Sequence, residues 1–208
     1  MANKDAAFGF RPLRNFGSSS WNGKVSVYYA PSTYATSIFK GDPVVVTGTA
    51  DPTGRYPEVN LATSDTAANP ITGIAIGFGS SPNLAANLAD LNLSYGALST
   101  NRYVYVVDDP DVVFACQEDG NMGIVGVGSN VNFLLGSGST VTGLSGAELD
   151  SSDAATTPGL QIRVLRAVGS EDNDATAANA VWECMINVHT FRSATADDGT
   201  TLKGMKGI

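Results

Sequence analysis

Short runs of β-branched and aromatic residues, separated by clusters of Gly, Pro, Asn, Asp, Ser and Thr, recur along the whole chain. The clearest run is 102–107, and the best two-faced run is 180–188, in which every second residue from Trp182 to Val188 is apolar. Apolar residues at a period of two are typical of strands that bury one face, and turn-forming clusters bound such strands. The sequence therefore predicts an all-β fold, a compact antiparallel barrel or sandwich that is jelly-roll-like or similar.

Other strands are predicted at 24–30, 43–47, 71–78, 112–117, 131–135 and 160–168. The run at 71–78 predicts one face formed by Ile74, Ile76 and Phe78. We interpret 102–107 and 112–117 as a hairpin, because the four residues between them, Asp-Asp-Pro-Asp, are turn formers.

One segment departs from the β pattern. Leu84, Leu88 and Leu91 follow Pro82 at helical spacing, which predicts a short crossing helix over 82–91.

The length of 208 residues allows one domain of ordinary size, or one domain with arms. We expect an extended N-terminal arm at 1–22, a β body at 23–192 and a flexible C-terminal tail at 193–208. Within the body, the Gly- and Ser-rich stretch 136–159 is too long for a tight turn, and loops of that length are usually functional or mobile.

The predicted arm contains Phe8, Phe10 and Phe16, separated by glycine, proline and arginine. Aromatic residues spaced in this way do not build a core by themselves. Two interpretations remain open at this point. They cover one end of the protein's own barrel, or they anchor an extended arm in the groove of a partner.

The composition excludes several classes of function. A net charge of −8 argues against a general nucleic-acid binder and against binding to anionic membranes. No apolar run approaches the ~20 residues of a membrane helix, and the first residues show no secretory signal pattern. We therefore expect a soluble protein made in a cytoplasm. Cys116 and Cys184 lie in apolar runs and are interpreted as small buried residues, with a disulfide as the less favoured alternative.

Residues equipped for catalysis are scarce. The single histidine, His189, is five residues from Cys184, so a regular strand would point the two side chains to opposite faces. The expected role of His189 is an ordinary hydrogen bond at a strand end. Asp108, Asp109 and Asp111 lack the spacing of a calcium loop and are interpreted as a solvated turn. We expect no catalytic residue, no metal site and no cofactor.

Several stretches, taken in order, have a further feature in common. They are Met1–Asn3 with Ala-Phe-Gly-Phe-Arg-Pro at 7–12, then 34–44, 139–143, 149–152, 160–165 and 186–189. Together they resemble the capsid decoration (cement) proteins of tailed bacteriophages. The resemblance spans the chain from Met1 to about His189, without a match between 79 and 101.

This resemblance implies a structural virion protein that transforms no substrate. Such proteins bind the outer surface of an icosahedral head, clamp neighbouring capsomers and often form dimers or trimers. The implied partners are the major capsid protein and further copies of the chain, with no nucleic acid and no membrane, and the implied location is the outside of the phage head after synthesis in the host cytoplasm. The capsid-binding residues are expected in the arm: Phe8, Phe10 and Phe16 as anchors, and Arg11 and Arg14 facing acidic or carbonyl groups.

Two alternatives come from other classes of function. A virion module that binds carbohydrate or a receptor would stack sugars on aromatic faces, for which Tyr28, Tyr29, Tyr103 and Tyr105 are candidates. A hydrolase would need paired carboxylates in a cleft, which the sequence does not reveal.

Overall fold

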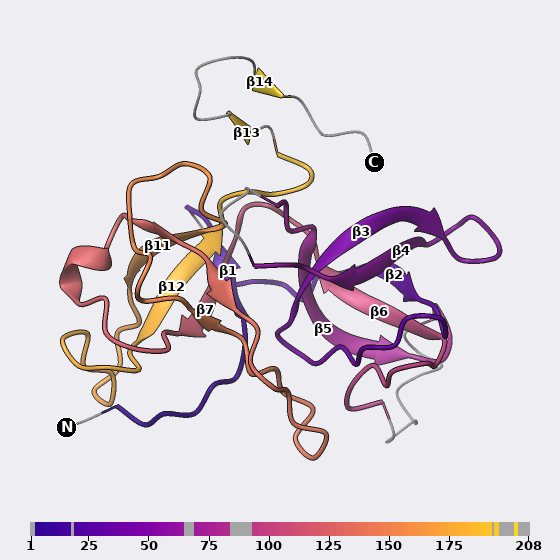
Figure 1. Ribbon diagram of the computed structural model, residues 1–208, viewed down its shortest axis with the longest axis horizontal. Helices are drawn as coiled ribbons and strands as arrows, with labels where there is room; N and C mark the ends of the chain where they lie inside the picture. The colour runs from indigo at the N-terminus through magenta and orange to yellow at the C-terminus, as the bar shows by residue number, and fades with distance from the viewer. Residues whose placement is uncertain are drawn as a thin grey trace.

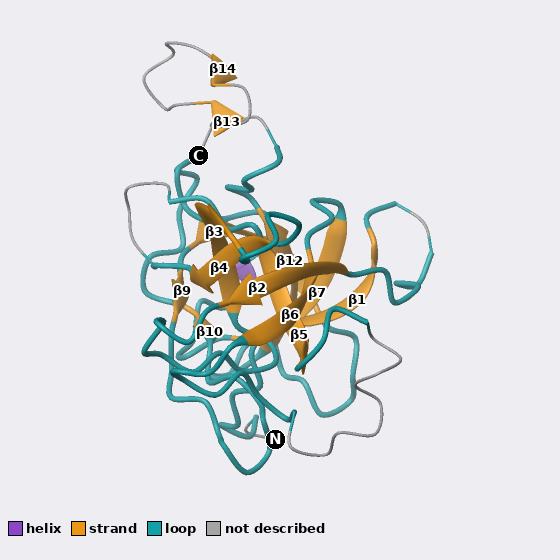
Figure 2. Ribbon diagram, turned by 90° about the vertical axis from the view of Figure 1, so that its right-hand side faces the viewer, coloured by secondary structure: helices purple, strands orange, loops and turns teal. Residues whose placement is uncertain are grey.

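The computed structural model describes residues 3–17, 19–64, 69–83 and 93–192, and the backbone of 194–195 and 202–203. Within these residues the protein consists of a closed five-stranded barrel beside a five-stranded sheet (Figure 1). The barrel lies on the right of that view and the sheet on the left. The predicted all-β barrel or sandwich is confirmed. Figure 2 shows that the strands of the barrel and of the sheet lie in the middle of the molecule and that long loops surround them.

The barrel has the strand order β2-β4-β3-β5-β6. Its strands are β2 (Ser26–Ala30), β3 (Pro43–Ala50), β4 (Pro57–Leu61), β5 (Gly73–Gly79) and β6 (Arg102–Val107). Neighbouring strands are antiparallel except β2 and β4, which meet in parallel at Tyr29 and Glu58 and close the barrel. Closure leaves no open sheet edge, which favours a rigid body.

The sheet has the order β1-β7-β12-β11-β8, with all neighbours antiparallel. Its strands are β1 (Arg11–Asn15), β7 (Val112–Gln117), β8 (Asn130–Val131), β11 (Ile162–Ala167) and β12 (Val181–Ile186). The remaining elements are the pair β9 (Phe133–Leu134) with β10 (Glu148–Leu149), the pair β13 (Ala194–Thr195) with β14 (Leu202–Lys203), and the short 3-10 helix η1 (Ile124–Gly126).

Two apolar cores hold these parts together. One fills the barrel and includes Val44, Val59 and Val104. The other joins the sheet to the barrel, since Trp182 of β12 and Ile74 of β5 belong to the same buried cluster. The barrel and the sheet therefore form one continuous body.

The predicted hairpin is wrong, although the limits of both strands are as predicted. β6 pairs with β2 and β5, and β7 pairs with β1 and β12. The connection at 108–111 carries the chain from the barrel to the sheet. All six residues of β7 are buried, so β7 is a central strand whose neighbours come from distant parts of the chain. Local turn composition does not encode such pairings.

The prediction that Ile74, Ile76 and Phe78 share one face of the strand at 71–78 is also wrong, because these residues pack into two different cores. The pairing of β5 with β6 shifts register between Ala75 and Gly77. Ile74 therefore packs into the core between sheet and barrel, whereas Phe78 packs inside the barrel. A bulge inserts one residue and so reverses the alternation beyond it.

Residues 3–17 and 19–22 are part of the body, which differs from the separate arm predicted for 1–22. The Asn3 side chain donates to Asp174 O and Ala178 O, and Gln117 Nε2 donates to Lys4 O. β1 is a strand of the main sheet. The N-terminal stretch therefore docks on its own chain throughout its described length.

The other boundary predictions have mixed outcomes. The stretch 136–159 contains β10 and places Ser145, Ala147 and Leu149 in buried positions, so part of this loop belongs to the core. Of the predicted helix over 82–91, residues 84–91 lie outside the described residues. The predicted tail also lies largely outside them, apart from the backbone of β13 and β14.

Candidate partner-binding pocket

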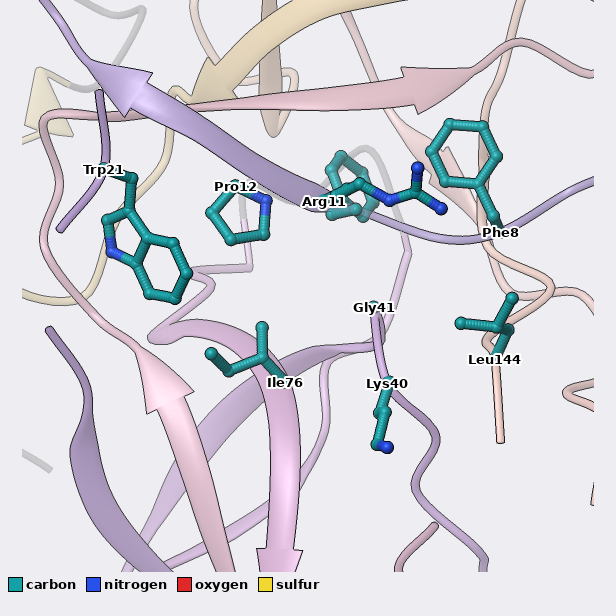
Figure 3. Close-up of a pocket in the computed structure, with 9 residues that line it drawn as sticks. Phe8, Arg11, Pro12, Trp21, Lys40, Gly41, Ile76 and Leu144 are labelled. Carbon is teal, nitrogen blue, oxygen red and sulfur yellow. The ribbon is translucent and has the colours of Figure 1, made fainter. Parts of the chain in front are cut away.

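A pocket of about 270 Å³ opens between β1 of the sheet and β5 of the barrel, and we call it the N-terminal pocket (Figure 3). Its lining is mostly apolar, with two cationic side chains. The lining residues are Phe8, Phe10, Arg11, Pro12, Trp21, Lys40, Gly41, Ile76 and Leu144.

At the floor of the pocket, three backbone segments approach one another closely. The Phe10 N–H donates to Gly41 O (3.0 Å), and the Gly41 N–H donates to Ala75 O (2.7 Å). Gly41 has a φ of +99°, and a Cβ atom there would lie 2.9 Å from Phe8 O. Only glycine fits this conformation and this spacing without strain. The floor is therefore fixed by the fold before any partner arrives.

The loop at 136–146 forms one wall of the pocket. The Lys40 N–H donates to Gly143 O (2.9 Å), and the Ser145 N–H donates to Lys40 O (2.8 Å). This pairing brings Leu144 to the pocket. The loop projects from the lower side of the body in Figure 1, and Val141 on it is 91% exposed. The pocket thus lies at the base of a projecting loop that carries an exposed apolar side chain.

The pocket is locally positive on an acidic protein. The Arg11 guanidinium lies 4.7 Å from the centroid of the Phe8 ring. Arg14, Arg166 and Arg192 form ion pairs, whereas neither Arg11 nor Lys40 forms one with any described residue. Since the chain has a net charge of −8, two cations that form no ion pair with a described residue are a local excess of positive charge.

The structure separates the five predicted capsid-binding residues. Phe8 and Arg11 line the pocket at its surface. Phe10 lines the pocket as a buried side chain. It is 2% exposed, and its ring packs edge-to-face on Phe114 and Phe133. For Phe10 the structure supports the interpretation of self-docking and contradicts the one of a partner anchor.

Arg14 and Phe16 do not line the pocket. Arg14 forms an ion pair with Glu183 (2.6 Å), which Arg166 also contacts. Burial acts to raise the pKa of Glu183, but the hydrogen bonds from Arg166 and Arg14 outweigh burial and lower that pKa. Arg14 is therefore engaged within the sheet and is not free for a partner. Phe16 is 57% exposed and remains a surface aromatic residue.

Sequence reasoning missed Trp21, Lys40, Ile76 and Leu144. The turn-like Lys-Gly-Asp at 40–42 was a usable signal, because a glycine next to a strand often marks a close backbone approach. No local signal brings Ile76 and Leu144 to this place, since each arrives through pairing with a distant segment.

The candidates for chemistry lie elsewhere and are buried. His189 Nδ1 accepts from the Phe191 N–H (3.0 Å), and burial lowers the pKa of His189 to about 4. Cys116 and Cys184 are free and buried, so the disulfide alternative is not observed, and burial raises the pKa of both thiols. Among the described residues, no group of three or more histidine, cysteine, aspartate or glutamate side chains is arranged to hold a metal ion.

The remaining polar candidates serve the fold. Asp108 accepts a hydrogen bond from the Tyr28 hydroxyl (2.9 Å), and Asp111 forms an ion pair with Arg192. Tyr28, Tyr29 and Tyr105 are buried. These three rings offer no open face for a sugar, which removes most of the basis for the carbohydrate alternative.

The described part of the chain has no helix that is both long and apolar enough to cross a bilayer. Comparisons of the chain with protein-family models, with curated proteins and with solved structures found no match.

Proposed function

We propose that this chain is a structural virion protein, a capsid decoration (cement) protein that binds the outer surface of an icosahedral phage head and clamps neighbouring capsomers. Its partners are the major capsid protein and other copies of the chain. The N-terminal pocket is the part of the surface that contacts the shell.

One observation supports this proposal above the others. Three of the stretches that resemble the decoration proteins are 7–12, 34–44 and 139–143, and they are far apart in sequence. Backbone hydrogen bonds join the first to the second at Phe10 and Gly41, and the second to the third at Lys40 and Gly143. The first two stretches line the pocket, and the third ends next to Leu144, which also lines it.

The rest of the molecule suits this role. A closed barrel that shares a core with a sheet forms a stiff body, so little conformational entropy is lost when it docks. A single shallow contact of this size is weak by itself. Many copies on a fixed lattice, or several contacts in one oligomer, act together and hold capsomers far more strongly than any one contact.

Binding to isolated phage heads tests the proposal. Heads that lack the chain are mixed with purified protein, and occupancy is measured by sedimentation and by electron microscopy. We expect saturable density on the outside of the shell, at seams between capsomers, and heads that resist heat or chelation better when decorated. Heads that take up no protein at micromolar concentration would contradict the proposal.

A matched pair of variants tests the role of the pocket. Arg11→Glu and Arg55→Glu reverse the charge of one exposed arginine each, and only Arg11 lines the pocket. We expect Arg11→Glu to weaken shell binding by about tenfold and to change its salt dependence, with Arg55→Glu close to wild type. Equal losses for both variants would mean that overall charge, not the pocket, controls binding.

A further inference from the structure

We infer that the N-terminal pocket binds a short acidic polypeptide segment that inserts one bulky apolar side chain. This inference rests on the proposed function and names the chemistry of the shell segment that the pocket recognises. The size of the pocket, its charge and the partly occupied edge of β1 support this inference.

The size of the pocket fits one side chain. Its volume of about 270 Å³ lies just below the range of about 300–1,000 Å³ in which small-molecule sites fall. Pro12, Trp21, Ile76 and Leu144 supply apolar surface on different sides of the opening (Figure 3). A leucine, methionine or phenylalanine side chain would lose contact with water there.

The positive charge of the pocket favours a partner segment with acidic residues next to its inserted apolar side chain. Arg11 and Lys40 lie on opposite sides of Gly41 in Figure 3 and make no ion pair with a described residue. Among the described residues, no carboxylate lines the pocket. A segment with acidic residues on both sides of its apolar residue would meet a cation on each side. Arginine is especially suited to carboxylates, which it binds with two parallel hydrogen bonds.

The edge of β1 is not free to accept a partner strand. The Trp21 N–H donates to Leu13 O (3.1 Å), and the Asn15 N–H donates to Ser19 O (2.9 Å). Residues 19–21 therefore already occupy the outer edge of β1 at residues 13–15. A partner strand cannot extend along the whole of β1, which favours docking through a side chain, because recognition by strand addition needs an open edge.

Synthetic peptides test the inference without phage heads. The probe is a peptide with one phenylalanine between two pairs of aspartates, and its controls replace the phenylalanine by serine or the aspartates by lysines. Binding is measured by two-dimensional NMR through the backbone amides of Lys40, Gly41 and Leu144. We expect shifts at these amides with a Kd of about 0.1–1 mM, and binding that weakens as salt rises.

Both control peptides should bind at least tenfold more weakly than the probe. Arg11→Glu should weaken binding of the probe by about tenfold, and Arg55→Glu should leave it unchanged. Equal binding of the serine peptide, equal binding by Arg11→Glu, or shifts confined to other parts of the chain would overturn the inference.

The peptide and shell experiments can fail independently. A chain that binds the probe but not phage heads would retain the pocket chemistry and lose the proposed function. A chain that binds heads equally well with Arg11→Glu, and does not bind the probe, would retain the function and lose this inference.

Discussion

His189 is a buried imidazole that the fold keeps neutral. It is 2% exposed, and its lowered pKa of about 4 compares with an ordinary value of about 6.5. A histidine with a depressed pKa contributes stability above pH ~6.5, and this contribution is lost as the pH falls toward 4, because the unfolded chain takes up the proton first. The contribution amounts to about 3 kcal/mol at most.

The variant His189→Asn isolates this effect, since an asparagine oxygen can accept the hydrogen bond from Phe191 and does not titrate. We expect the stability difference between wild type and variant to shrink as the pH falls from 7 to 4, measured by urea denaturation at each pH. The comparison with the variant matters because burial raises the pKa of Asp42 and Glu118, whose contributions have the opposite sign. A difference that stays constant with pH would show that folding does not shift the pKa of His189.

Phe10 and Phe16 give a second prediction at the residue scale. Phe10 is 2% exposed and packs among other aromatic rings, whereas Phe16 is 57% exposed. Phe10→Ala should lower the free energy of unfolding by about 3–5 kcal/mol, and Phe16→Ala by less than about 0.5 kcal/mol. Chemical denaturation of both variants measures this. Similar small losses would mean that Phe10 does not belong to the core.

The sequence alone could not separate these two residues. Both are aromatic residues set between glycine, proline and arginine, and own core and partner groove were both open interpretations. Burial of Phe10 depends on Phe114 and Phe133, which lie more than a hundred positions away along the chain. A local pattern carries no information about such neighbours.

At the scale of elements, the segment around Gly41 shapes the pocket. Gly41 and Gly54 both have positive φ values, +99° and +68°, but only Gly41 has backbone atoms where a Cβ would be placed. Gly54→Ala should therefore lose only about 1 kcal/mol of stability, and Gly41→Ala clearly more. Thermal unfolding of the two variants compares them directly. Equal losses would mean that the floor of the pocket relaxes at little cost.

Strand limits could be predicted far better than strand partners. The limits 102–107 and 112–117 agree with β6 and β7, because alternation and turn residues are local properties. The pairing of these strands was wrong, since it depends on which distant segments share a core. For the same reason, part of the pocket lining could not be predicted from the sequence. Arg11 could be predicted from the sequence, but Ile76 lies at the bulge in β5, and Leu144 comes from a loop that pairs with residue 40.

At the scale of the whole molecule, the N-terminal stretch completes the body. β1 supplies one neighbour of the central strand β7, Phe10 fills the shared core, and Arg14 is one of two arginines that contact Glu183. The sheet and the pocket therefore depend on the same few residues. A change that detaches this stretch would remove the binding surface and destabilise the fold together.

Deletion of residues 1–16 tests this dependence. If the stretch were a detachable arm, the truncated chain would unfold cooperatively at the wild-type midpoint. We expect instead a loss of at least ~5 kcal/mol, comparable with the whole stability of many domains, because the deletion removes a strand, opens a core and exposes the edge of β7. Circular dichroism and size-exclusion chromatography should show an unfolded or aggregated protein. A synthetic peptide of residues 1–16, present in trans during refolding, should restore the circular dichroism spectrum and the elution volume of the folded protein, whereas the same peptide with Phe10→Ala should not. Wild-type stability of the truncated chain would show that β1 is dispensable and would restore the interpretation of a free arm.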